Sequence, residues 1–295
     1  MLPITLKNPA QFDAYLFSGW NPTISGIFEQ FHIVKISDYK SHLHLPVPPH
    51  RRAVFLFVYV TKGWAIRSKG LNTYRIEANQ VFFLPADQIT SLDEISSDIE
   101  GYYCHFQPSL FVESGIKFDS ISAWPFFSRD GNPLISLGEP ERIQPILDIL
   151  LGEYLQNDPS RKSIIPYYLQ VLFAEFKFSI PHADTPARRF SEALTQRYQE
   201  SLSQHLSRFH SVEAFADFLQ VSPNHLNKVV KASTGKSAQQ LLIEMRLLEA
   251  KVLLKQSDLS MSEITERIGK NDSSDFSRFF KLHEKITPLA YRMQK

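Results

Sequence analysis

Short apolar runs that alternate with polar residues fill the chain from about residue 28 to 111. Alternation with a period of two is typical of strands with one buried face. The segments predicted as strands are 31–36, 54–60, 64–68, 73–77, 81–85 and 101–106. The expected turns are at Gly63, Gly70, Asn72 and Asn79. Strands that follow one another without helices predict a β-barrel or a jelly roll.

The apolar pattern changes to a helical period after residue 140. Segments 141–156 and 164–178 each carry a continuous apolar stripe, which predicts two amphipathic helices. The sequence Asn157-Asp158-Pro159-Ser160 breaks the pattern between them. We therefore expect a helical hairpin.

A second helical pattern occurs twice between Ser211 and Arg292, about 50 residues apart. Its apolar positions are Val212, Phe215, Ala216, Leu219, Val221, Leu226, Val229 and Val230 in the first copy, and Met261, Ile264, Ile268, Phe276, Phe279 and Phe280 in the second. The matching positions outside the stripe are Lys228 and Arg278, Lys231 and Lys281, and Ser237 and Thr287. This repetition predicts a duplicated helix-turn-helix.

Residues that start helices support the same division. Ser222 can cap the second helix of the first copy, with Pro223 at its first position. Ser260 and Glu263 form a capping box at the start of the second copy. Segment 238–256 predicts one long connecting helix, and segment 190–206 predicts a helix that precedes both copies.

Four segments in the last third of the chain resemble the AraC/XylS family of bacterial transcription regulators. They are LQVSPNHLNKVVK (219–231), RLLEAKVLL (246–254), SDFSRFFK (274–281) and TPLAYR (287–292). More weakly, PHRRAVFLFVYVTKGWA (49–65) followed by NQVFFLPADQIT (79–90) resembles the cupin-like effector domain of many such regulators. The resemblance implies an α+β multidomain protein in which a β-barrel with a helical hairpin precedes an all-α domain.

The expected domains follow from these segments and from the length of the chain. With 295 residues, 43% of them hydrophobic, the chain can bury the cores of two domains. We predict a cupin-like sensor and dimerisation domain at 1–180, a linker at 181–189, and an AraC-type DNA-binding domain at 190–295.

The net charge of +1 is divided unevenly. Residues 188–295 contain 17 lysines and arginines against 12 acidic residues, and the remainder contains 15 against 19. A basic excess beside the two motifs suits contact with DNA phosphates. A solvated helical surface would give a similar excess, so the charge supports DNA binding only together with the motifs.

The composition also excludes some classes of protein. A single cysteine, Cys104, cannot form an internal disulfide framework or a C-x-x-C zinc site. The N-terminus lacks a basic region followed by a long apolar run, and no stretch of about 18 apolar residues occurs. We therefore expect a cytoplasmic protein without membrane spans.

The resemblance implies a sequence-specific transcriptional regulator that is not an enzyme. Its expected partners are double-stranded DNA, a small-molecule effector in the barrel, and RNA polymerase. A homodimer through 141–178 is expected from the family, although the hairpin packing only onto its own barrel has equal weight.

Polar residues of the second helix in each motif are the predicted DNA-binding residues. Such a helix lies in the major groove, where Asn pairs with adenine and Lys or Arg with guanine. Matching the family motif assigns base reading to Asn224, Asn227 and Lys228, with His225 beside them, and to Ser273, Ser274 and Arg278 in the second copy. Lys231 can reach guanine or phosphate, and Lys281 is expected at a phosphate. For each of these residues, the alternative is a solvent-facing position without a DNA contact.

Aromatic residues on the predicted strands can line an effector cavity, with a few polar groups to orient the ligand. The candidates are His50, Arg52, Phe57, Tyr59, Trp64, Tyr103 and His105. The alternative, that these side chains only fill the barrel, is favoured for any single residue.

No metal or other cofactor is expected. Cupin enzymes hold a metal with a His-x-His pair, a Glu and a later His. Here His42 and His44 are followed by Pro48 and Pro49 where the Glu is expected, and Thr90 stands at the position of the later His. A metal needs its full set of ligands.

Two other functions are weaker alternatives: a cupin-type enzyme with an accessory helical domain, and a DNA-repair methyl acceptor. The incomplete ligand set argues against the first, and the isolation of Cys104 in an apolar strand argues against the second.

The second motif departs from the family at three residues. Lys270 replaces an aromatic residue, and Asp275 places a negative charge near the expected groove surface. Lys285 replaces a glycine, which predicts either a left-handed residue that costs about 1 kcal/mol or a rearranged turn.

Overall fold

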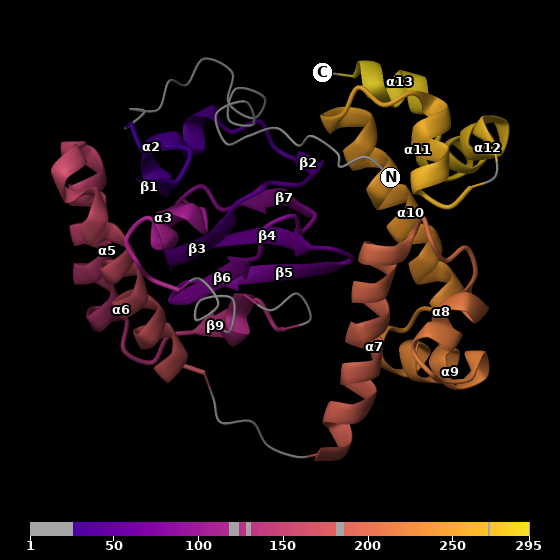
Figure 1. Ribbon diagram of the computed structural model, residues 1–295, viewed down its shortest axis with the longest axis horizontal. Helices are drawn as coiled ribbons and strands as arrows, with labels where there is room; N and C mark the ends of the chain where they lie inside the picture. The colour runs from indigo at the N-terminus through magenta and orange to yellow at the C-terminus, as the bar shows by residue number, and fades with distance from the viewer. Residues whose placement is uncertain (1–25, 118–123, 128–130, 181–185, 271, 295) are drawn as a thin grey trace. The chain divides into compact units, whose positions relative to one another are not determined.

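A computed structural model describes residues 26–117, 124–127, 131–180, 186–270 and 272–294 (Figure 1). The chain forms two compact units and passes from the first to the second near residue 182.

The strands described in the N-terminal unit form two sheets. Their bounds are β1 (Phe31–Lys35), β2 (Val47–His50), β3 (Phe55–Lys62), β4 (Trp64–Lys69), β5 (Asn72–Glu77), β6 (Gln80–Leu84), β7 (Thr90–Ile95), β8 (Glu100–Phe106) and β9 (Leu134–Ser136). A five-stranded sheet has the order β1-β8-β3-β6-β9, and a four-stranded sheet has the order β2-β7-β4-β5. The pairs β1–β8, β3–β8 and β3–β6 are antiparallel.

Both faces of the five-stranded sheet are buried, and β3 illustrates why. Its even-numbered residues Leu56, Val58 and Val60 pack into an apolar core with residues of the four-stranded sheet, so the two sheets face each other. Its odd-numbered residues Phe57 and Tyr59 pack on the opposite side. Successive side chains of a strand point to opposite faces, so one apolar run serves two cores.

The helical hairpin covers the outer face of the five-stranded sheet. It consists of α5 (Pro140–Gln156) and α6 (Ile165–Phe178), joined by the short 3-10 helix η3 (Pro159–Ile164). Figure 1 shows the two helices side by side along the sheets. Buried side chains of both helices share one core with β1, β3 and β8. Short helices in the described part of this unit also include α2 (Ile36–Tyr39), η1 (Lys40–His42), α3 (Ser109–Val112) and η2 (Pro125–Phe127).

The predicted α+β architecture and the helical hairpin are confirmed, but three strands escaped prediction. β2 contains Pro48 and Pro49, which are rare in strands. β7 has the largely polar sequence TSLDEI, and β9 is three residues long. Asn72, expected in a turn, is the first residue of β5.

The helices described in the C-terminal unit reproduce the repeat. They are α7 (Pro186–His205), α8 (Val212–Phe218), α9 (Pro223–Thr234), α10 (Ala238–Gln256), α11 (Met261–Arg267), α12 (Ser273–Glu284) and α13 (Pro288–Met293). The second helices of the two motifs, α9 and α12, begin and end 50 residues apart, and we call them the recognition helices. The helix α7 begins at Pro186, inside the predicted linker 181–189, whose first five residues lie outside the described part of the chain.

The predicted caps are confirmed. The Ser222 side chain accepts from the backbone N–H of His225 at the start of α9, where Pro223 is the first residue. Ser260 and Glu263 form the expected capping box of α11. Among the described residues, no helix is long and apolar enough to cross a membrane.

Candidate nucleic-acid interface and sensor cluster

The recognition helix α9 presents its predicted DNA-binding residues to solvent. Asn224, His225, Asn227, Lys228 and Lys231 are all exposed, while Leu226 and Val230 are buried. The helix therefore packs on one side and leaves polar side chains on the other, as groove binding requires.

Asn227 has a structural role that its position in the motif did not reveal. Its side-chain oxygen accepts a hydrogen bond of 3.0 Å from the backbone N–H of Ala238, the first residue of α10. That N–H has no partner within α10, because the first N–H groups of a helix lack one. Asn227 thus holds the recognition helix to the connecting helix.

The recognition helix α12 is less polar at the equivalent positions. Ser274, Arg278 and Lys281 are exposed, and Ser273 is half-buried. Asp272, rather than Asp275, caps the helix by accepting from the Asp275 backbone N–H at 2.7 Å.

The departures at Lys270 and Asp275 compensate each other. The Lys270 ammonium lies 3.2 Å from the Asp275 carboxylate and 4.4 Å from the centre of the Phe279 ring. A cation over an aromatic face is stabilising, and the ion pair offsets the acidic charge of Asp275.

Lys285 adopts the left-handed conformation that its position demands. Its φ is 65°, close to the 73° of Gly235 at the equivalent end of α9. The backbone N–H of each residue donates to the carbonyl four residues earlier, at 3.0 Å for Lys285 and 2.9 Å for Gly235. The turn is therefore retained at the cost of an unfavourable conformation for a residue with a side chain.

Four of the seven predicted effector-binding residues belong to one polar cluster between the two sheets. We call it the sensor cluster; its members are His32, His50, Arg52, Arg67, Tyr103 and His105. The Arg52 guanidinium donates to the Tyr103 hydroxyl, which lies 3.4 Å from His105 Nδ1. Arg67 Nε donates to Thr90 Oγ1 at 3.0 Å.

Sequence reasoning missed His32 and Arg67. His32 Nδ1 shares a hydrogen bond of 2.8 Å with the Tyr154 hydroxyl. Arg67 is only 7% exposed although its side chain is charged. A charged residue at an inward position of an alternating strand is the signal that identifies it.

Burial holds the histidines of the sensor cluster neutral. It lowers the pKa of His32 to about 3, with a further contribution from the Arg52 charge. Burial, followed by Arg67, lowers the pKa of His50, and burial, followed by Arg52 and His32, lowers that of His105. Removal from water penalises the charged form of a base, and neighbouring cations add to that penalty.

The three remaining effector candidates lie elsewhere. Phe57 and Tyr59 face the helical hairpin; the Phe57 ring is 5.7 Å from that of Phe176. Trp64 is half-buried at the start of β4, with the Arg75 guanidinium 4.0 Å from its ring centre. These three residues therefore lie outside the sensor cluster. Alternation alone cannot tell which face of a doubly buried strand points towards the other sheet.

The described residues hold no group of three or more His, Cys, Asp or Glu side chains placed to bind a metal ion. Cys104 is buried in the core under the hairpin, and burial raises the pKa of its thiol. A buried thiol with a raised pKa is a poor nucleophile.

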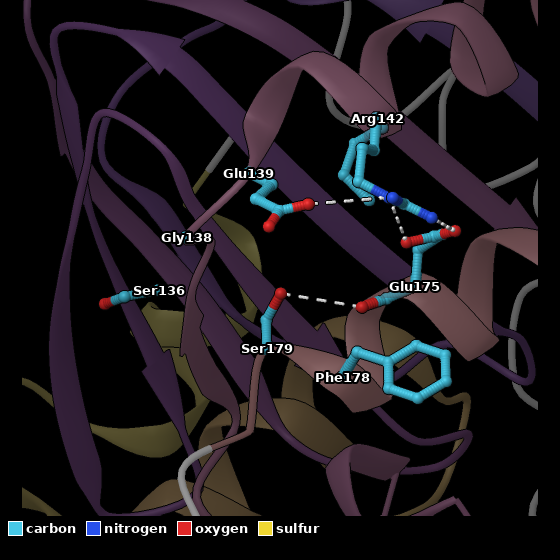
Figure 2. A pocket seen from close by; sticks show the side chains of 8 residues that line it. Ser136, Gly138, Glu139, Arg142, Glu175, Phe178 and Ser179 are labelled. Carbon is cyan, nitrogen blue, oxygen red and sulfur yellow. Dashed lines mark hydrogen bonds and ion pairs between the residues drawn. The ribbon is translucent and has the colours of Figure 1, made fainter.

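A groove beside the hairpin, with a volume of 560 Å³, contains an ion pair that joins the two helices. Figure 2 shows Arg142 of α5 between Glu139 and Glu175 of α6. Arg142 Nε and Nη2 each donate to Glu175 at 3.0 Å. None of the predicted site residues lines this groove, and its charged groups join the helices of the hairpin.

Comparisons with known proteins agree with this geometry. Residues 215–294 match the family model of a helix-turn-helix domain. The chain is 25% identical over 244 residues to the HTH-type transcriptional activator RhaR of Enterobacter sp. (strain 638), which covers 80% of this chain and 83% of that relative. Residues 215–294 therefore form an AraC-type helix-turn-helix domain.

Two further similar proteins match the AraC-type domain alone. The HTH-type transcriptional activator RhaS of Salmonella schwarzengrund is 36% identical over 91 residues, covering 31% of this chain and 33% of that relative. The C-terminal domain of AraT, a response regulator from Geobacillus stearothermophilus, is 32% identical, covers 35% of this chain and 85% of that chain, and has a TM-score of 0.33. RhaR and RhaS are named as regulators of transcription, not as enzymes.

Proposed function

We propose that this AraC-type protein is a sequence-specific regulator of transcription that responds to a small molecule. The observation that carries the proposal is the exact repetition of two capped, exposed recognition helices within one basic unit. Two such helices can enter successive major grooves on one face of DNA, a helical turn apart.

The proposed base contacts are unequal between the two helices. Asn224 and Lys228 of α9 are exposed and long enough to reach base edges, and Arg278 is their counterpart on α12. Ser273 and Ser274 are short and pair with either donors or acceptors, so they discriminate weakly. Lys231 and Lys281 supply phosphate contacts, and Asn227 combines any base contact with its bond to Ala238.

Substitutions in α9 should therefore relax sequence preference more than substitutions in α12. The measurement is the affinity of the full chain for a site selected from random DNA and for all single-base variants of that site. We expect Asn224→Ala or Lys228→Ala to remove about 1–3 kcal/mol of discrimination within one half-site, the value of a good bidentate contact. Ser274→Ala should leave discrimination almost unchanged.

Two outcomes contradict these expectations separately. Equal losses under both helices in the single-base variants would refute the asymmetry. If the wild-type chain shows no preferred sequence, and no decline in affinity with salt, the proposed regulatory function is wrong.

The N-terminal unit is proposed to sense the small molecule through the sensor cluster. Arg52, Arg67 and Tyr103 can donate hydrogen bonds, so the cluster suits a ligand with carboxylate or hydroxyl oxygens. Its position between the sheets, reached by strands of both, supports a role in sensing.

A ligand for this cluster should raise the thermal midpoint of the N-terminal unit. A set of small organic acids and sugars would be tested by tryptophan fluorescence, because Trp20, Trp64 and Trp124 all precede residue 180. Binding at about 100 times Kd stabilises by about 2.7 kcal/mol. Arg67→Gln should abolish the shift, whereas Phe57→Leu, on the outer face, should retain it; the opposite pattern would place the ligand elsewhere.

The remaining parts of the proposal concern partners and location. Exposed apolar residues on the hairpin support dimerisation through 141–178; they are Ile149, Leu155, Tyr167, Val171 and Phe178. A regulator of this kind acts without catalysis, in the compartment that holds DNA and RNA polymerase, which is the cytoplasm of a bacterium.

A further inference from the structure

The connecting helix α10 changes its packing partner halfway along its length. Ala238, Leu241, Leu242 and Met245 belong to the apolar core of the first motif. Leu247, Ala250, Leu253 and Leu254 belong to a separate core with the second motif. Each motif therefore has its own apolar core, and Arg246 lies at the boundary between the two.

Arg246 makes hydrogen bonds to both motifs. Its Nη2 donates at 2.8 Å to the carbonyl of His210, in the loop before α8. Its Nε donates at 3.0 Å to the carbonyl of Ile268, and Nη2 also donates at 3.2 Å to that of Gly269, both in the turn after α11. The side chain is only 6% exposed, so these bonds are largely protected from water.

The chemistry of the guanidinium group suits this bridge. It carries five donors in a fixed plane, so it can bond carbonyls on opposite sides simultaneously, which the single nitrogen of lysine cannot. The carbonyls at the end of α11 carry partial negative charge that favours a cation. Asp275 of α12 adds a favourable charge, although burial lowers the pKa of Arg246 overall.

Close backbone packing beside Arg246 also holds the two motifs together. Gly269 has a φ of 69°, and a β-carbon there would lie 2.5 Å from the Leu206 carbonyl oxygen and 3.3 Å from the His210 ring. The turn of the second motif thus lies directly against the chain that enters the first. Because packed interfaces resist continuous deformation, such a contact allows one orientation.

We propose that Arg246 is the positioning residue that fixes the two recognition helices relative to each other, and thereby the separation between half-sites that the protein accepts. The inference rests on the proposed function for its DNA consequence, but not for its structural part. Arg246 would determine specificity without touching a base, because the second helix reaches its groove only at one rotational setting.

The structural part is tested by measuring a distance in the full chain without DNA. Spin labels would be placed at Ala232→Cys and Leu282→Cys, exposed residues at equivalent positions of α9 and α12. The native Cys104 is fully buried, so it should not react with the label. We expect a narrow distance distribution that broadens at least twofold in Arg246→Lys; an unchanged distribution would overturn the proposal.

The DNA part is tested with the selected duplex and a duplex carrying about two additional base pairs between half-sites, which rotates the second half-site by about 70°. The wild-type chain should bind the longer duplex at least about tenfold more weakly, comparable to the loss of one good base contact. Arg246→Lys should narrow this difference to less than about threefold, while its affinity for a duplex with only the first half-site stays within about twofold of wild type.

A matched variant separates positioning from stability. Ile264→Val removes a methylene from the core of the second motif without touching the bridge. It should lower the thermal midpoint yet keep both the narrow distance and the full dependence on spacing. If Ile264→Val behaves like Arg246→Lys, stability rather than position controls spacing and the proposal is wrong.

The two parts of the inference can fail separately from the proposed function. If the wild-type chain selects no DNA site, the proposed function and the DNA consequence fail together. The distance measurement still decides whether Arg246 fixes the orientation.

Discussion

Lowering the pH from about 7.5 to about 5.5 should destabilise the N-terminal unit by about 4 kcal/mol. The effect comes from three buried histidines of the sensor cluster, His32, His50 and His105, each no more than 3% exposed. Burial lowers the pKa of all three, that of His32 to about 3. They are therefore neutral in the folded protein over this range.

The sign of the effect follows from proton uptake by the unfolded chain. There each imidazole takes a proton as the pH falls through its ordinary pKa of 6.5. The unfolded state then binds more protons, so this part of the stability is complete above about pH 6.5 and is lost progressively towards about pH 3. The three histidines contribute about equally between the two measured pH values, which gives the total of about 4 kcal/mol.

Tryptophan fluorescence during urea unfolding measures this directly, because all three tryptophans lie in the N-terminal part of the chain. His32→Gln should reduce the pH dependence by about a third, whatever its effect on stability at neutral pH. His225→Gln, at an exposed position of α9, is the control and should leave the pH dependence as in wild type. A free energy of unfolding that is equal at both pH values would contradict the assignment of neutral, buried histidines.

Gly269→Ala should destabilise the second motif by about 3–5 kcal/mol, from left-handed strain and overpacking combined. The left-handed φ of 69° accounts for about 1–2 kcal/mol. The larger part is steric, because the new methyl group would meet the Leu206 carbonyl oxygen at 2.5 Å, and backbone cannot rotate away as a flexible side chain can. A lower thermal midpoint by helical circular dichroism, together with an unchanged thermal midpoint by tryptophan fluorescence, would place the effect in the C-terminal unit.

Gly235→Ala is the matched control for this substitution. Gly235 has a φ of 73°, but nothing lies within 4 Å of an added β-carbon. This variant should show the conformational strain alone, about 1–2 kcal/mol. If both variants lose the same stability, the close packing of Gly269 against the first motif is not energetically significant.

Local signals in the sequence predicted the C-terminal unit well. Ser222 with Pro223, and Ser260 with Glu263, start helices where their cap chemistry requires. These interactions involve residues three positions apart, so the sequence contains all the information that they need.

Non-local partners limited the prediction of the site. The role of Asn227 depends on Ala238, and the role of Arg246 depends on carbonyls 22 to 36 residues away. Backbone acceptors carry no sequence signature, so no motif could reveal either bond. From the sequence, Lys270 was only a departure from the family's aromatic residue, and its contacts with Asp275 and Phe279 explain it.

In the N-terminal unit, the sequence did not show which face of each strand packs against the other sheet. β3 is apolar at nearly every position, and its alternation does not say which residues meet the other sheet and which meet the helices. The side on which Phe57 and Tyr59 lie, towards the hairpin, could not be assigned from the sequence for this reason. A strand buried on both sides needs its neighbours before its faces can be assigned.

The five-stranded sheet has a core on each side, so it contacts the sensor cluster with one face and the helical hairpin with the other. Adjacent residues of β8 show this: Tyr103 belongs to the sensor cluster, while Tyr102 donates a hydrogen bond of 2.7 Å to Asp148 of α5. A strand that moves to accommodate a molecule between the sheets moves both residues, because one backbone carries them. A displacement of β8 would therefore alter the sensor cluster and the contact with α5 together.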